Sequence, residues 1–282
     1  MRSDVLDAPS DVYLLRETGV QTLTGDTPES ELYPVINPDA ARVAFVEIAP
    51  TGERSIVVTD TETGTKTTLF VPTADLSVGL YAPAWSADGS MVFATLVNAT
   101  GETAIYLMQV GEPLEGNPCV PSVPCLITEG AAPFLTPDGQ FMAYTLGSNV
   151  MIMLVESGLS QPITEQPEGS ICETPSFDRD GLTLYFVCID SNTSLVFRYD
   201  LDGLSEVLLS GEDGQSRTFT EAGSGQTFGL VTLGDNSTFQ TVTDPVLAEN
   251  ATIALPVVQI AGLNTRHLRW YLSPPEVSAL MP

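Results

Sequence analysis

A short motif recurs along this chain at intervals close to fifty residues, and it restricts the possible folds strongly. Its four clear copies are residues 33–39 (YPVINPD), 82–89 (APAWSADG), 132–139 (APFLTPDG) and 174–181 (TPSFDRDG). The prolines of successive copies lie 49, 50 and 42 residues apart, and an apolar, strand-like segment follows each copy. Repeats at this spacing indicate a repeated supersecondary unit, and the period is that of one β-propeller blade.

The second half of each unit predicts two further strands joined by a polar turn. These halves are residues 55–70, 104–128, 149–164 and 194–210. Apolar and polar residues alternate within such segments, and glycine-containing turns supply the positive φ that hairpins require. Each unit is therefore predicted to be a four-stranded antiparallel meander.

The two ends of the chain together predict a sixth unit. A degenerate fifth copy is residues 217–223, and a sixth start is residues 268–274, which has no second half after it. Residues 11–24 form a second half that has no start before it. Pairing the ends would close a six-bladed ring and remove exposed sheet edges. The chain is thus predicted to be one domain, residues 1–282, with blades 33–70, 82–128, 132–164, 174–210, 217–255 and 268–282 plus 11–24.

These motifs resemble the WD-related repeats of TolB-like six-bladed β-propellers over residues 11–274. Three copies depart from the pattern: Ala40 replaces the expected glycine, Ala222 replaces an aspartate, and the last copy lacks Asp-Gly. The resemblance implies an all-β protein that binds partners. Related propellers also serve in carbohydrate-active enzymes and as gating domains of prolyl peptidases.

The Asp-Gly pairs are predicted to be structural, although paired carboxylates can also serve as acid and base or bind calcium. In the hairpin between the first two strands, aspartate hydrogen-bonds the turn backbone and glycine takes positive φ. The residues in these predicted roles are Asp39, Asp88, Gly89, Asp138, Gly139, Asp180 and Gly181.

Four cysteines form two close pairs, Cys119 with Cys125 and Cys172 with Cys188, and neither has zinc-ligand spacing. A three-residue loop at 179–181 would place Cys172 opposite Cys188, within reach of a disulfide. Two buried thiols in a reducing compartment are the alternative. We expect both bonds, and hence an extracytoplasmic location.

The charge of the chain limits its partners. The formal net charge is −26, and Lys66 is the single lysine. Such a field disfavours nucleic acid and anionic membrane surfaces but permits cationic peptides or metal ions. No apolar run is long enough to insert into a bilayer, and residues 1–4 (MRSD) do not resemble an export signal. If the protein is exported, we expect that signal to be missing from this sequence.

The sequence contains no recognisable catalytic motif. His267 is the single histidine, and there is neither a Gly-x-Ser-x-Gly elbow nor a phosphate-binding loop. We therefore predict a monomeric, non-catalytic module without cofactors that binds a protein or peptide through the loops opposite the Asp-Gly turns. A carbohydrate-active or peptidase-associated propeller, and a structural calcium or small-ligand binder, are the alternatives. The predicted loop segments are 49–54, 71–81, 98–103, 129–132, 165–173, 190–192, 211–216 and 256–266.

Overall fold

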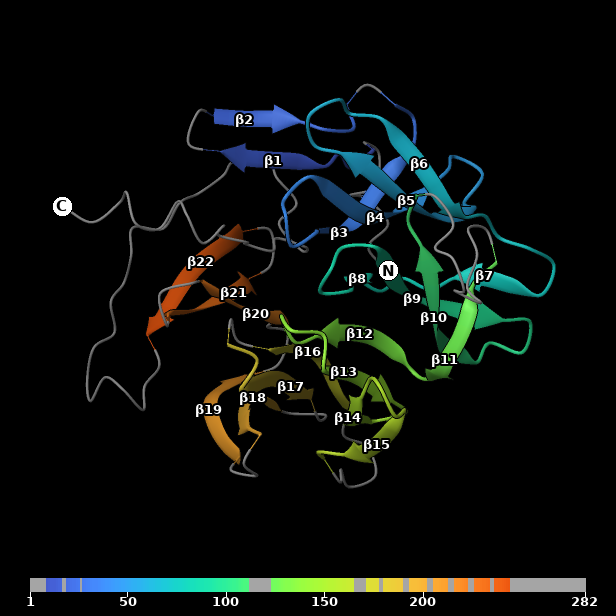
Figure 1. Cartoon of the computed structure of the whole chain (residues 1–282). Helices are drawn as coiled ribbons and strands as arrows, with labels where there is room; N and C mark the ends of the chain where they lie inside the picture. Colours follow the sequence, from blue (N-terminus) through green and yellow to red (C-terminus); the bar gives the residue numbers. More distant parts are fainter. Residues whose placement is uncertain are drawn as a thin grey trace. The chain divides into compact units, whose positions relative to one another are not determined.

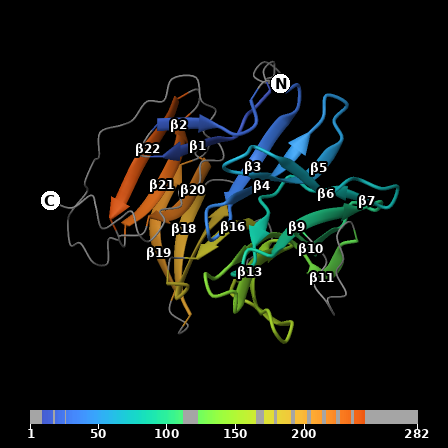
Figure 2. The same ribbon diagram turned by 45° about the horizontal axis from the view of Figure 1, so that its top comes forward.

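The computed structural model describes residues 9–16, 19–25, 27–111, 123–164, 171–177, 180–189, 193–201, 205–212, 216–222, 226–233 and 236–243. Every regular element within these ranges is a β-strand, and neighbouring strands within these ranges pair antiparallel (Figures 1 and 2). The chain divides into two compact units, Met1–Pro133 and Phe134–Pro282. The predicted all-β class with antiparallel sheets is confirmed.

The first unit contains a hairpin and two larger sheets. The hairpin is β1 (Tyr13–Arg16) with β2 (Gly19–Thr22), and the next sheet is β3 (Ser30–Ile36), β4 (Arg42–Ile48), β5 (Arg54–Asp60) and β6 (Lys66–Phe70). The third sheet contains β7 (Leu76–Val78), β8 (Ala84–Trp85), β9 (Met91–Asn98), β10 (Thr103–Gln109) and β11 (Cys125–Glu129). Strands β7 and β8 both pair with β9, so the segment 71–81, predicted to be a loop, contains a strand.

The second unit continues the same pattern. One sheet is β12 (Ala131–Leu135), which spans the boundary between the units, β13 (Phe141–Leu146), β14 (Asn149–Leu154) and β15 (Leu159–Pro162). The next is β16 (Ile171–Phe177), β17 (Thr183–Ile189), β18 (Thr193–Asp200) and β19 (Ser205–Glu212). A three-stranded sheet follows, β20 (Ser216–Ala222), β21 (Gln226–Leu233) and β22 (Asn236–Thr243). Four sheets in the described part of the chain thus have the strands of a full blade. The predicted ring-closing segment 268–274 lies outside the described residues, so six blades remain a prediction.

The sheet β3–β6 is apolar on both faces. In β4, Val43 and Phe45 contribute to one buried cluster with Val12 of the segment before β1, whereas Ala44 and Val46 contribute to another. Successive strand residues point to opposite faces, so these two sets lie on the two sides of one sheet. The sheet is therefore enclosed between the N-terminal hairpin and the sheet β7–β11.

The second unit is held together in the same way. Buried side chains from β13 and β14 pack with Cys172, Phe177 and Phe186 of the following sheet. The ring centroids of Phe134 and Phe177 lie 6.4 Å apart, and Phe186 stacks on Phe197 at 5.3 Å. Aromatic pairs at such separations add to the stability that area burial provides.

The proline of the motif lies at an irregularity in the first strand of two sheets. The register between β3 and β4 shifts between Leu32 and Val35, around Pro34, and the register between β16 and β17 shifts between Glu173 and Ser176, around Pro175. Proline lacks the N–H that a strand ladder requires, so bulges are among the few sheet positions that accept it.

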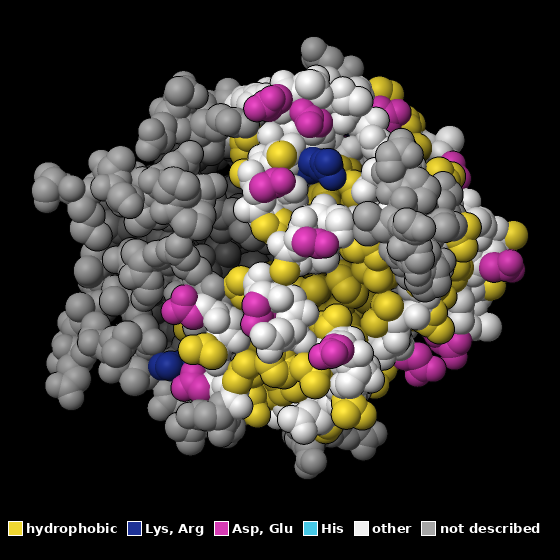
Figure 3. Space-filling model, viewed as in Figure 1, with side chains coloured by type: hydrophobic (Ala, Val, Ile, Leu, Met, Phe, Trp, Pro, Cys, Tyr) yellow, Lys and Arg dark blue, Asp and Glu magenta, His cyan; other side chains and the backbone are white. Residues whose placement is uncertain are grey.

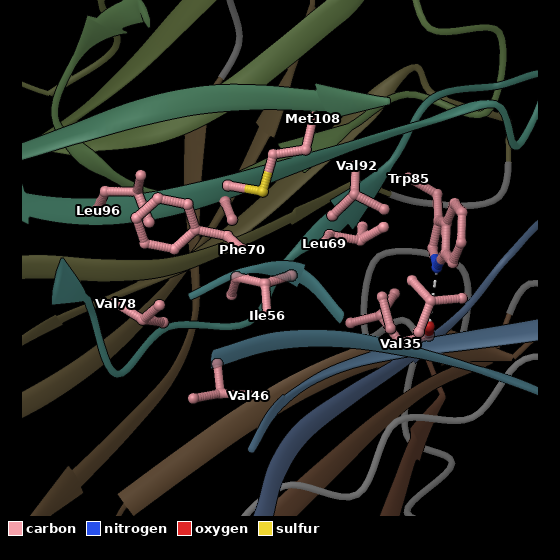
Figure 4. Packing of buried hydrophobic residues seen from close by; sticks show 13 residues of the cluster. Val35, Val46, Ile56, Leu69, Phe70, Val78, Trp85, Val92, Leu96 and Met108 are labelled. Atoms are coloured by element: carbon pink, nitrogen blue, oxygen red, sulfur yellow. Dashed lines mark hydrogen bonds between the residues drawn. The ribbon is translucent and has the colours of Figure 1, made fainter. Parts of the chain in front are cut away.

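Trp85 links two successive sheets of the first unit. Its buried indole Nε1 donates a hydrogen bond of 2.9 Å to the backbone carbonyl of Val35, which belongs to β3 (Figure 4). The indole ring itself packs among the valines and leucines of the same cluster. The aromatic residue of the motif therefore fastens its own blade to the preceding one.

We predict that Trp85→Phe lowers the free energy of unfolding by about 2 kcal/mol, because the Val35 carbonyl loses its buried donor and a gap remains beside it. Urea denaturation of the full chain measures the change. The control, Tyr81→Phe, removes a hydroxyl from a side chain that is 39% exposed and should change stability by less than about 0.5 kcal/mol. Equal effects of the two substitutions would contradict this role for the indole.

Candidate functional site

The Asp88 carboxylate is engaged by its own turn. Asp88 Oδ1 accepts hydrogen bonds from the Ser86 hydroxyl at 2.6 Å and from the backbone N–H of Ser90 at 3.0 Å. The Ser86 hydroxyl and the groups of Ser90 hold the pKa of Asp88 below its usual range, because they stabilise the ionised form. This carboxylate therefore orders a hairpin and is poorly suited to accept a proton in catalysis.

Asp138 makes the same two contacts, and Asp39 repeats the backbone one. Asp138 accepts from the Thr136 hydroxyl at 2.6 Å and from the Gln140 N–H at 2.9 Å, and these bonds lower its pKa. Asp39 accepts from the Ala41 N–H at 2.9 Å. Asp180 is exposed next to Gly181, and the two residues before it lie outside the described ranges.

The residue after each aspartate has a left-handed backbone. Gly89, Gly139 and Gly181 have φ values of 68°, 71° and 71°, and Ala40 has φ of 59° at the corresponding place. A side chain is strained in this region, so Ala40 carries a cost that glycine avoids.

Successive turns also approach one another within each unit. A Cβ added to Gly89 would lie 3.3 Å from Asn37 Nδ2 of the preceding turn, and one added to Gly181 would lie 3.1 Å from Pro137 Cδ. Glycine thus serves both backbone conformation and close packing. The Asp-Gly pairs at 88–89 and 138–139 are therefore explained by the hairpins that they form.

Cys172 and Cys188 are joined by a disulfide, with Cα atoms 4.0 Å apart. The predicted register is correct at the cysteines, which oppose each other, but wrong near the turn, where Phe177 opposes Leu184. The pairs near the turn are thus offset by one residue from the prediction, and the register shift around Pro175 restores the predicted pairing at Cys172. Cys125 is also disulfide-bonded, and its predicted partner Cys119 lies outside the described residues.

A compact group of charged residues surrounds Lys66, and the sequence analysis did not identify it as a site. Lys66 Nζ donates to Glu31 Oε1 at 2.9 Å and to Glu47 Oε2 at 2.5 Å, and it lies 5.7 Å from the centroid of the Phe45 ring. The side chain of Glu31 is fully buried. The Thr24 hydroxyl donates to Glu31 Oε2 at 2.9 Å. The sequence feature that could have pointed to this group is the presence of a single lysine among so many carboxylates.

The electrostatics of this group reflect its burial. Burial raises the pKa of Glu31, and hydrogen bonds from Lys66 and Thr24 offset part of that rise. Burial lowers the pKa of Lys66, but its bonds to Glu47 and Glu31 outweigh this and raise the pKa above the usual value. Lys66 is therefore charged at neutral pH and balances part of the charge of its two partners.

Four predicted loop segments meet at one end of the first unit. Arg54 Nη1 donates to the carbonyl of Val78 at 3.3 Å, Leu76 pairs with Asn98, and the Gly130 N–H donates to the carbonyl of Thr103 at 2.9 Å. These contacts connect segments 49–54, 71–81, 98–103 and 129–132. We call the surface of these segments the loop surface.

The loop surface combines exposed apolar and acidic side chains. Val71 is 55% exposed, and Leu80 and Tyr81 are each 39% exposed. Its exposed acidic residues are Glu53, Asp75, Glu102 and Glu129. In the view of Figure 3, hydrophobic side chains of the described residues lie between scattered carboxylates, and few lysine or arginine side chains are visible. Apolar side chains at a rigid end of a sheet are typical of contact surfaces.

Other candidate positions are only partly visible. His267 and segments 190–192 and 256–266 lie outside the described residues, as do most of segment 165–173 and half of segment 211–216. Within the described ranges, histidine, cysteine and acidic side chains form no group of three that could hold a metal ion. The same ranges contain no helix long and apolar enough to cross a membrane.

We predict that Ala40→Gly stabilises the protein by about 0.5–1 kcal/mol, because glycine relieves the positive φ that alanine adopts at this turn. The matched substitution Gly89→Ala introduces the same strain in the next blade and should destabilise by about 1–2 kcal/mol. Thermal and urea unfolding of both variants give the comparison. A destabilising Ala40→Gly would contradict the assignment of backbone strain to this residue.

We predict no reactive thiol when the chain is unfolded without reductant and treated with a thiol reagent. Replacing Cys172 and Cys188 together by alanine should lower stability by about 2–4 kcal/mol, because the unfolded chain gains freedom. Mass spectrometry counts the labelled sites, and urea unfolding gives the stability. Labelling at all four cysteines would contradict both predicted bonds.

No family model matches the sequence, and no curated protein matches it. Solved structures do show a similar fold. TolB from Acinetobacter baumannii aligns with a TM-score of 0.62 and 20% identity over 80% of this chain and 54% of that chain. An oligogalacturonate lyase in complex with manganese aligns with a TM-score of 0.65 and 12% identity, over 88% of this chain and 72% of that chain. A prolyl endopeptidase aligns with a TM-score of 0.55 and 16% identity, over 87% of this chain and 38% of that chain.

The alignment covers 54% of the TolB chain, so this chain spans about half the length of that structure. These identities support a statement about the fold and leave the activity open. The antiparallel sheets of this chain are arranged as a β-propeller, similar to those of TolB and of the propeller-containing enzymes.

Proposed function

We propose that this protein is a non-catalytic binding module that holds a cationic peptide or protein segment on its loop surface. The observation that carries the proposal is the exposure of Val71, Leu80 and Tyr81 on segments joined to one another by hydrogen bonds and strand pairing. Exposed side chains on a sheet-supported surface bind with little loss of backbone freedom. The strongly negative charge favours a basic partner, because it steers cations toward the surface.

The roles of the described carboxylates support binding over catalysis. Asp88 and Asp138 have lowered pKa values and are held by their turns, so they are poor general acids. Glu31 is enclosed and bonded to Lys66 and Thr24. None of these groups is free to transfer a proton to a bound molecule.

An activity like that of the oligogalacturonate lyase is less compatible with the charge of this chain. Its substrate is a polyanion, and a net charge of −26 repels polyanions. The single lysine is bound to two carboxylates and is not available to attract an acidic sugar. The prolyl endopeptidase is much longer than this chain, because the alignment covers 38% of it.

We further propose an extracytoplasmic location and a closed ring of six blades. The Cys172–Cys188 disulfide supports the location, since such bonds persist in oxidising compartments. The hairpin β1–β2 supports the ring, because in the repeat pattern it corresponds to the third and fourth strands of a blade. The first strand of that proposed blade is residues 268–273. A closed ring would leave the loop surface on a rigid support.

We predict that a random peptide library displayed on phage, selected on the purified full chain, yields sequences rich in arginine or lysine with an apolar or aromatic residue. Synthetic copies should bind at least about tenfold more weakly to the variant Leu80→Ser/Tyr81→Ser, and more weakly as salt is raised. Fluorescence anisotropy measures both effects. Leu159→Ser is the control, because Leu159 is 73% exposed at the turn between β14 and β15, outside the loop surface.

Selection of acidic peptides, or equal weakening by Leu159→Ser, would contradict the proposed surface. The same preparation is incubated with oligogalacturonate and with proline-containing peptides. If product forms, and a substitution at one carboxylate abolishes its formation, the protein is an enzyme and the non-catalytic assignment is wrong.

A further inference from the structure

The charged group around Lys66 contains more negative than positive charge. Glu31 and Glu47 face each other directly on neighbouring strands, β3 and β4. Carboxylates directly opposite one another repel. Asp11 lies close enough to Glu31 to raise its pKa further, and Lys66 is the cation that bridges the opposed pair. The charged groups that face Glu31 are thus two carboxylates, Asp11 and Glu47, and one ammonium, Lys66.

Glu31 also connects the N-terminal segment to the first complete sheet. Its carboxylate accepts a bond from the Thr24 hydroxyl, and Thr24 Oγ1 in turn accepts a bond of 2.7 Å from the backbone N–H of Val12. The backbone N–H of Glu31 donates to the carbonyl of Ser10 at 2.7 Å. A change in the charge of Glu31 therefore acts directly on the residues that flank β1 and β2.

The remaining contacts of the hairpin are mainly apolar. Val12 and Leu23 pack with Val43, Phe45 and Val57 on one face of the sheet β3–β6. In addition, Gln21 Nε2 donates to the carbonyl of Thr61 at 2.9 Å. Within the described residues, β1 and β2 pair with each other and with no further strand. If the hairpin lifts, this apolar face becomes accessible to water or to a partner.

We propose that Glu31 and Lys66 form a proton-sensitive clasp, which holds the hairpin β1–β2 on the first complete sheet more tightly as the pH falls. Glu31 is the group that takes up the proton, and Lys66 is its fixed counter-ion. Uptake of one proton removes the repulsion that Glu31 experiences from Glu47 and Asp11. It also relieves the cost of enclosing an ionised carboxylate.

The direction follows from linkage between protonation and opening. When the hairpin is closed, the pKa of Glu31 is above its ordinary value, whereas in the open state water surrounds the carboxylate and the pKa returns to that value. The closed state therefore binds the proton more tightly. The extra stability that this proton gives the closed hairpin is complete at a pH below the ordinary pKa of Glu31. It is lost as the pH rises through the raised pKa that Glu31 has in the closed state. Lys66 loses its contribution only in alkali, because its pKa is raised from an already high value.

The test is hydrogen exchange on the full chain between mildly acidic and neutral pH. Amides of residues 12–15 and 20–24 report the opening of the hairpin after correction for the intrinsic exchange rate. In the unmodified protein, we expect their opening constant to fall several-fold as the pH is lowered through this range. In Glu31→Gln, which keeps an uncharged side chain of the same shape, the constant should be low throughout and nearly independent of pH.

A double-mutant cycle separates the clasp from general stability. Lys66→Met should raise the opening constant at neutral pH several-fold when Glu31 is present, and much less in the Glu31→Gln chain. Glu102→Gln, which neutralises an exposed carboxylate in the turn between β9 and β10, is the control and should leave the hairpin amides unchanged. If Lys66→Met does not fold, the pH profile of Glu31→Gln alone decides. An equal pH dependence in Glu31→Gln and the unmodified chain, or an opening constant that rises on acidification, would overturn the proposal.

Discussion

The burial of both faces of each central sheet is the constraint on which the rest of this structure depends. A strand such as β4 places Val43 and Phe45 on one side and Ala44 and Val46 on the other, and all four are buried. A sheet of this kind is unstable until a second layer covers each side. Within each unit, neighbouring sheets therefore cover one another's apolar faces. The Trp85 indole adds a directional bond to contacts that are otherwise not directional.

This arrangement also explains how a very acidic chain remains folded. Carboxylates that lie in turns gain hydrogen bonds from hydroxyl and backbone donors, so their charge is used to order the hairpin. Those on the exposed loops remain in water, where charge costs little and repels polyanions. Glu31 is the exception, because it is enclosed within a sheet–hairpin contact and needs an ammonium partner. The lysine of the chain is placed where an uncompensated carboxylate would be most costly.

The sequence was sufficient to predict features that recur, and insufficient for features that occur once. Motif copies with a proline and Asp-Gly predicted the strand order and the turns because each residue type has a backbone reason to be there. The strand β7 was missed because Leu76–Val78 is too short for its alternation to be visible. The one-residue offset near the turn and the bulge around Pro175 were missed because their effects on the register cancel, which left the Cys172–Cys188 pair correctly placed.

The Glu31 clasp escaped prediction for another reason. Glu31 and Lys66 are far apart in the sequence and lie on β3 and β6, with two strands of the same sheet between them, so their contact depends on the sheet order. The presence of one lysine has a practical consequence for anyone who handles the protein. Amine-directed dyes, cross-linkers and immobilisation chemistries can react with one side chain, and its nitrogen is already occupied by two carboxylates. A label that does attach there would disturb the contact between the hairpin and the sheet β3–β6, so a tag introduced at the exposed turn of residues 156–158, outside the loop surface, is the gentler choice.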